Sequence, residues 1–82
     1  MINIKNKEIM GYKSKLKRLR VSNGMTQNEL SELSGINIKS IASYEQNPEK
    51  INKASVESVY NIAECLGCNI EDIMYNNEKR SK

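Results

Sequence analysis

The chain has 82 residues, enough for one domain with one small core. Thirteen Lys and Arg residues against ten Asp and Glu residues give a net charge of +3, and there is no His. Lack of His removes the commonest general acid–base group and metal ligand, which weakens an enzymatic interpretation. No apolar run is long enough to span a bilayer, and the N-terminus lacks the apolar region of a secretory signal. We therefore expect a soluble cytoplasmic protein that is not an enzyme and makes no membrane contact.

The charges are unevenly distributed along the chain. Residues 1–20 hold seven basic residues against Glu8 alone, a local balance of +6. Residues 54–78 hold five acidic residues and no Lys or Arg, a local balance of −5. A basic end suggests a polyanionic partner, although a solvated charged surface explains the charges nearly as well.

The N-terminal part predicts an arm followed by a helix. Residues 1–10 show no convincing period and are predicted to be an N-terminal arm or a frayed helix start. A helix that ends near Ser22 follows, because Asn23-Gly24 is a strong breaker. The apolar residues at helical spacing in this helix are Ile9, Tyr12, Leu16 and Leu19.

A second helix is predicted at about residues 27–34. Thr26 is a good N-cap, and Glu29 three residues later completes a capping box. Leu30 and Leu33 are expected to share its inner face.

A tight turn should join this helix to a third one at about residues 37–46. Gly35 supplies the positive φ where the second helix stops, and Asn37 can cap the third. Ile41 and Tyr44 are expected on its inner face, opposite a strip of small or polar groups formed by Lys39, Ser40 and Ser43. A helix that packs on the domain with its apolar face and exposes such a polar strip on the opposite face suits the major groove of DNA.

Two further helices complete the prediction. Residues 48–53 should form a loop, Ser55 should cap a fourth helix that Gly67 ends, and Asn69 should cap a short fifth one. The apolar positions of the last two helices are Val56, Val59, Tyr60, Ile62, Ala63, Leu66, Ile70, Ile73 and Met74. Residues 76–82 have the composition of a disordered polar tail.

Three pieces of this pattern occur together in one known family. They are Leu16-Lys17-Arg18-Leu19-Arg20, the stretch from Met25-Thr26-Gln27 to Tyr44-Glu45, and the spaced residues Val59, Ile62, Ala63, Leu66, Gly67, Ile70 and Ile73. Over about residues 11–75 the chain resembles the phage-repressor and Cro type of helix-turn-helix domain, also called the xenobiotic-response-element family. The resemblance implies an all-α, compact five-helix lambda-repressor-like domain. Such a domain binds double-stranded operator DNA, usually as a homodimer on a palindrome.

The resemblance also assigns roles to individual residues. It places Gln27 at a phosphate, where this residue often also helps to position side chains of the recognition helix. It places residues 37–40 at the exposed start of that helix and Ser43 on the same face. It pairs Arg20 with Glu45 in a salt bridge behind the motif. The chain departs from the family at Asn47, where Gly is usual; because Pro48 follows, the helix exit is expected to differ.

The chemistry of the side chains adds to these DNA contacts. Lys39 can bind a guanine or a phosphate, and Ile38 can either contact a thymine methyl or be partly buried. Lys50 and Lys53 are expected to meet phosphates, which position a protein without reading sequence. The predicted DNA-binding residues are Gln27, Asn37, Ile38, Lys39, Ser40, Ser43, Lys50 and Lys53.

Two features near the C-terminus concern metals and association. Cys65 and Cys68 form a C-x-x-C, but without His or a second pair of cysteines we favour reduced cysteines that pack in the core over a zinc or redox site. No cofactor is expected. Apolar residues at the end of the domain exceed what a small core can bury and predict a homodimer interface. They are Ile70, Ile73, Met74 and Tyr75.

The function expected from these features is sequence-specific regulation of transcription. Because the chain ends soon after the fifth helix, regulation is expected to come from concentration, dimerisation or an unknown protein partner. An antitoxin or a restriction controller would use the same domain for a partner protein. A protein-interaction module that has lost DNA binding is the alternative from another class. It would not need basic groups gathered around one face.

Overall fold

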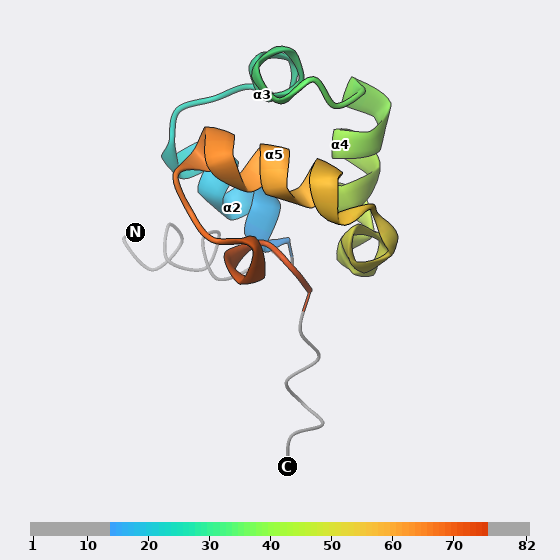
Figure 1. Cartoon of the computed structure of the whole chain (residues 1–82). Coiled ribbons are helices and arrows are strands. Elements are labelled where there is room, and N and C mark those ends of the chain that lie inside the picture. The colour runs from blue at the N-terminus through green and yellow to red at the C-terminus, as the bar shows by residue number, and fades with distance from the viewer. Residues whose placement is uncertain (1–13, 76–82) are drawn as a thin grey trace, which may run out of the picture.

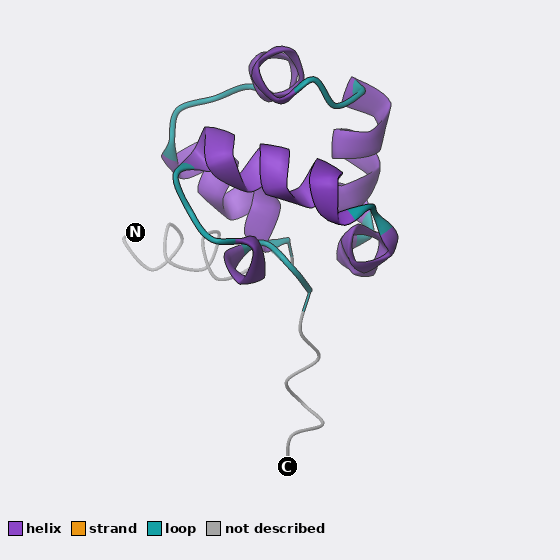
Figure 2. Ribbon diagram, in the orientation of Figure 1, coloured by secondary structure: helices purple, strands orange, loops and turns teal. Residues whose placement is uncertain are grey.

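The computed structural model describes residues 14–75. Within that range lie four α-helices and two 3-10 helices and no strand (Figure 2). They are, with the labels of Figure 1, α2 (Lys15–Ser22), α3 (Gln27–Ser34), α4 (Ile38–Gln46), η1 (Pro48–Lys53), α5 (Val56–Leu66) and η2 (Ile70–Asp72). The predicted arm at residues 1–10, the polar tail at 76–82, and the residues Ile9 and Tyr12 lie outside the described residues.

The all-α helix-turn-helix fold predicted from the sequence is confirmed, with two local differences. The predicted fifth helix is only the three-residue 3-10 helix η2. The segment 48–53 was predicted to be a loop, and it forms the 3-10 helix η1 instead. Proline at the first helical position favours this, because its fixed φ suits a helix start. Ile51 holds η1 to the domain, since its side chain is buried in the core.

Local caps set the ends of the motif helices. At the start of α3, Thr26 Oγ1 accepts from the Glu29 amide at 3.0 Å, and Glu29 Oε1 accepts from the Thr26 amide at 2.9 Å. Gly35 ends α3 with φ 77°, a left-handed conformation that side chains disfavour. Ser55 caps α5 by accepting from the Ser58 amide at 3.1 Å. These short helices therefore begin and end where the sequence predicts.

The core gathers residues from every described helix except η2, together with the residue that follows η2. In Figure 1, α5 runs across the middle of the molecule, with α3 above it and α4 at the right edge. The helix pairs α3–α5 and α3–α4 are in contact, as are α4 and η1. The buried hydrophobic residues are Leu16, Leu30, Ile41, Ile51, Val59, Ile62, Ala63, Leu66 and Ile73.

Leu33, Val56 and Tyr60 do not have the buried positions that their helical spacing predicts. Leu33 is 65% exposed, Val56 is 75% exposed and Tyr60 is 51% exposed. Ser34, and not Leu33, shares the buried face of α3 with Leu30. At about 100° per residue, positions 30 and 34 lie about 40° apart on the helix, whereas position 33 lies about 100° from position 34. On an eight-residue helix this narrow buried stripe leaves Leu33 outside it.

A reciprocal pair of hydrogen bonds fastens the end of the described chain to η1. Asn52 Nδ2 donates to the carbonyl oxygen of Tyr75 at 3.0 Å, and the Tyr75 amide donates to Asn52 Oδ1 at 3.0 Å. The two residues are 23 positions apart, and the side-chain amide of Asn52 satisfies both backbone groups of Tyr75.

Candidate nucleic-acid interface

The N-terminal end of α4 projects exposed side chains from a fixed backbone. Asn37 Oδ1 accepts from the Lys39 amide at 2.7 Å and thereby caps the helix. Ile38, 38% exposed, and Lys39 occupy the first turn, while Ser40 and Ser43 are half-buried. Ile41, on the side opposite Lys39, is fully buried and holds the helix to the core. The exposed groups are thus presented by a helix that cannot turn about its own axis without losing its core contact.

An ion pair braces α4 against α2. Arg20 Nε lies 2.6 Å from Glu45 Oε2, and Arg20 Nη2 lies 3.0 Å from Glu45 Oε1. Both side chains are nearly excluded from solvent, at 10% and 3% exposure. Arg20 Nη1 also donates to the carbonyl oxygen of Met25 at 2.6 Å, which ties the same guanidinium to the chain just before α3. The pair implied by the family resemblance is therefore present and bidentate, the geometry in which Arg–carboxylate pairs are strongest.

Gln27 joins this brace. Its Nε2 donates to Glu45 Oε1 at 3.0 Å, so one carboxylate accepts from two residues on two helices. The family resemblance implies that Gln27 touches a phosphate and helps to position side chains of the recognition helix, and the bond to Glu45 of α4 is a contact of the second kind. The bond restricts the Gln27 side chain at the first turn of α3.

The two loop lysines follow α4 on η1. Lys50 and Lys53 are both exposed and three residues apart. In a 3-10 helix, positions i and i+3 are eclipsed, with a rise of about 2 Å per residue, so both side chains leave one side of η1 about 6 Å apart along its axis. The exit from α4 differs from a glycine exit, as Pro48 predicts: Asn47 has φ −126°, outside the left-handed region.

The predicted DNA-binding residues thus lie on three consecutive elements. Asn37, Ile38, Lys39, Ser40 and Ser43 belong to α4 and its cap, Lys50 and Lys53 to η1, and Gln27 to the start of α3. In Figure 1, α4 forms one edge of the molecule and η1 lies at its C-terminal end. Lys50 and Lys53 on η1 are therefore separated from the start of the recognition helix by the length of α4.

Comparison with known proteins places this arrangement in a family. The profile of the helix-turn-helix family matches residues 16–73, which is most of the chain. The chain belongs to the Cro/C1-type helix-turn-helix family. No curated protein and no solved structure matches it in the same comparisons. Members of this family are DNA-binding domains that regulate transcription, and the family is not one of enzymes.

The prediction that Ile73 belongs to the dimer interface is wrong. Ile73 is only 2% exposed and belongs to the core, so it has no surface to offer a second copy. The turn after η2 directs it inward. Ile70, Met74 and Tyr75 are half-buried against the core and keep part of their surface accessible.

The cysteines are free and half-buried at the end of α5. Burial, with a smaller contribution from Glu64, raises the pKa of the Cys65 thiol. Burial, with a smaller contribution from Asp72, raises the pKa of Cys68. Both shifts favour the protonated, less nucleophilic thiol. Across residues 14–75, no three Cys, Asp or Glu side chains are grouped closely enough to hold a metal ion. In the same range, no helix has the length and apolar character needed to cross a membrane.

Proposed function

We propose that this helix-turn-helix protein is a sequence-specific regulator that inserts the start of α4 into the major groove of an operator. The arrangement of Ile38 and Lys39 on the first turn of a braced helix carries this proposal. Lys39 is exposed on the side of α4 opposite Ile41, and Ile38, 38% exposed, begins the stripe on which Ile41 and Glu45 fix the helix to the domain. The N-terminal residues of such a helix are the ones that reach base edges.

The distribution of charge supports DNA over a pure interaction module. Along α4 and η1 the exposed charged residues are Lys39, Lys50, Lys53 and Glu49, since the other acid, Glu45, is buried against Arg20. By contrast, α3 and residues 54–75 contain no Lys or Arg. The basic edge formed by α4 and η1, with acidic groups on α3 and residues 54–75, would orient the domain toward phosphates with its recognition helix first.

We further propose that the protein binds an inverted repeat as a homodimer. One recognition helix reads only a few base pairs, too few to mark a site in a genome. Two such helices related by a two-fold axis would occupy half-sites about one turn of DNA apart, roughly 34 Å. With Ile73 buried, the accessible parts of Ile70, Met74 and Tyr75 remain for contact with the second copy.

Selection of bound sequences from a random duplex pool tests these proposals. We expect enrichment of an inverted repeat. Insertion of five base pairs between its half-sites, which puts them on opposite faces of the duplex, should abolish the cooperative part of binding. Tight binding to an isolated half-site, unchanged by the insertion, would contradict the homodimer. Failure of a folded protein to enrich any sequence would contradict operator binding and favour the interaction module.

A further inference from the structure

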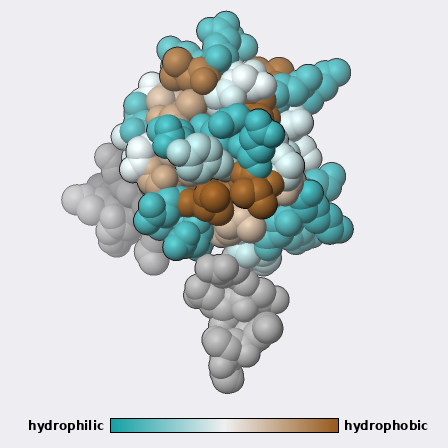
Figure 3. All heavy atoms as spheres, in the orientation of Figure 1, coloured by the Kyte–Doolittle hydropathy of each residue, from teal (hydrophilic) through white to brown (hydrophobic). Residues whose placement is uncertain are grey.

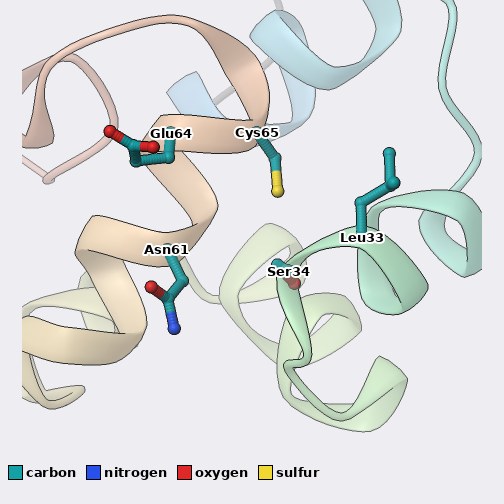
Figure 4. A pocket seen from close by; sticks show the side chains of 5 residues that line it. All are labelled: Leu33, Ser34, Asn61, Glu64 and Cys65. Atoms are coloured by element: carbon teal, nitrogen blue, oxygen red, sulfur yellow. The ribbon is translucent and has the colours of Figure 1, made fainter.

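The side of α5 that faces α3 carries an open groove away from α4. Its lining residues are Leu33, Ser34, Asn61, Glu64 and Cys65, and we call it the α3–α5 groove. Figure 4 shows Cys65 and Asn61 extending from α5 toward the last turn of α3, where Leu33 and Ser34 lie. A second hollow, lined by Tyr60, Ile70 and Glu71 among others, lies on the other side of Glu64, which lines both. Glu64 is therefore a ridge between two depressions.

The two segments that line the groove carry acidic residues and no basic ones. No Lys or Arg occurs in α3 or in residues 54–75. The acidic residues of these two segments are all exposed, and they are Glu29, Glu32, Glu57, Glu64, Glu71 and Asp72. Such a surface repels the phosphates of DNA and attracts a cationic partner.

The same surface presents apolar groups that the core does not use. Leu33 stands at the edge of the groove with most of its side chain in solvent, and Tyr60 is half in solvent one turn from Glu64. The Tyr60 hydroxyl donates to Glu64 Oε2 at 2.9 Å, which orients the carboxylate on the ridge. Figure 3 shows hydrophobic patches between hydrophilic groups on this side of the molecule. Acidic and apolar groups together match a partner that is both basic and apolar.

We propose that the α3–α5 groove docks a cationic amphipathic helix of a partner protein. Glu57, Tyr60 and Glu64 lie at i, i+3 and i+7 along α5 and so form one stripe. The two carboxylates are about 10.5 Å apart along the helix axis, at 1.5 Å per residue. Lysine or arginine residues seven apart on a helix alongside α5 have the same spacing. An apolar residue between them would lie against Leu33 in the groove, the helix-in-groove mode of recognition.

The groove and the start of α4 involve different residues, so groove variants leave the proposed DNA-contacting side chains unchanged. The probe is a synthetic helical peptide with lysines seven residues apart and leucines between them. Amide chemical shifts of the 82-residue protein are followed during its titration. We expect saturable binding, with the largest shifts at Leu33, Asn61 and Cys65. The same peptide with glutamate in place of lysine should not bind.

Variants of exposed residues complete the test. Glu64→Lys should weaken peptide binding about tenfold or more, and Glu64→Gln about two- to fivefold. Leu33→Ala should weaken it about fivefold. Glu49→Gln, which removes an exposed acid from η1, is the matched control and should change nothing. Circular dichroism verifies that each variant is folded, and Glu64→Gln decides the question should Glu64→Lys not fold.

Three outcomes would overturn the proposal. The first is no binding, or binding with shifts centred outside the groove. The second is equal weakening by Glu49→Gln and Glu64→Gln, which would indicate general charge attraction. The third is self-association of the wild type that Glu64→Lys abolishes, which would make the occupant a second copy of this chain.

Discussion

Arg20 and Glu45 face each other edge to edge, with two hydrogen bonds of 2.6 and 3.0 Å joining α2 to the last turn of α4. Gln27 adds a third bond to the same carboxylate. The orientation of the recognition helix thus depends on one buried carboxylate, and loss of either partner leaves a charge without its counterpart in a poorly hydrated place.

We expect the costs of removing this pair to be strongly non-additive. Glu45→Ala and Arg20→Ala should each lower the free energy of unfolding by about 3–5 kcal/mol, because each strands a buried charge. The double variant should lose much less than the sum, since no unpaired charge remains. Urea unfolding of the four proteins measures this, with Glu49→Ala as an exposed-acid control. Additive losses would show that the two side chains act separately.

The lysines should divide into one that reads sequence and one that does not. Lys39→Ala should weaken binding to the selected operator and relax the preference at one base position, by about 1–3 kcal/mol. Lys53→Ala should weaken binding to all sequences alike and reduce the salt dependence by about one counterion. Competition binding at several salt concentrations separates the two effects. An unchanged base preference in Lys39→Ala would reduce Lys39 to a phosphate contact.

Substitutions of Asn37 separate its role as the N-cap of α4 from its proposed contact with DNA. Asn37→Ala removes the acceptor for the Lys39 amide and should lower stability by about 1 kcal/mol. Asn37→Asp keeps the cap and should retain stability, but its negative charge should weaken DNA binding by repulsion of phosphates. Thermal unfolding and operator affinity are measured on the same samples. Equal DNA affinity of wild type and Asn37→Asp would place residue 37 away from the backbone of the duplex.

The cysteines should react slowly with alkylating reagents in the folded protein. Because burial raises the pKa of both thiols, less thiolate is present at pH 8 than in the unfolded chain. The folded state therefore binds these protons more tightly, and this contribution to stability is present below the unfolded pKa and lost as pH rises through the folded values. Iodoacetamide labelling of Cys65→Ser and Cys68→Ser variants, with and without urea, measures each thiol. About one bound zinc per chain or per dimer would contradict reduced, metal-free cysteines.

The sequence predicted the helix ends well because they depend on neighbouring residues. Thr26 with Glu29, Asn37, Ser55 and Gly35 each act within a few positions of themselves, and each has its predicted role in the structure. The same locality explains why the motif could be recognised in a single sequence.

The burial of individual side chains was predicted less well, because it depends on which distant segments of the chain pack against them. Leu33 has helical spacing from Leu30, but α5 covers only the stripe that contains Ser34. Ile73 looked available for a partner, yet the turn after η2 carries it into the core. The bond from Gln27 to Glu45 likewise joins residues whose proximity only the tertiary structure creates.

The clasp between Asn52 and Tyr75 has a consequence for local opening. The Tyr75 amide donates to a side chain on η1, so it can exchange its proton with solvent only when that contact breaks. Separation of residue 75 from η1 therefore breaks two hydrogen bonds of its backbone together. Amide exchange at residue 75 would then report how often the chain leaves η1, the helix that carries Lys50 and Lys53.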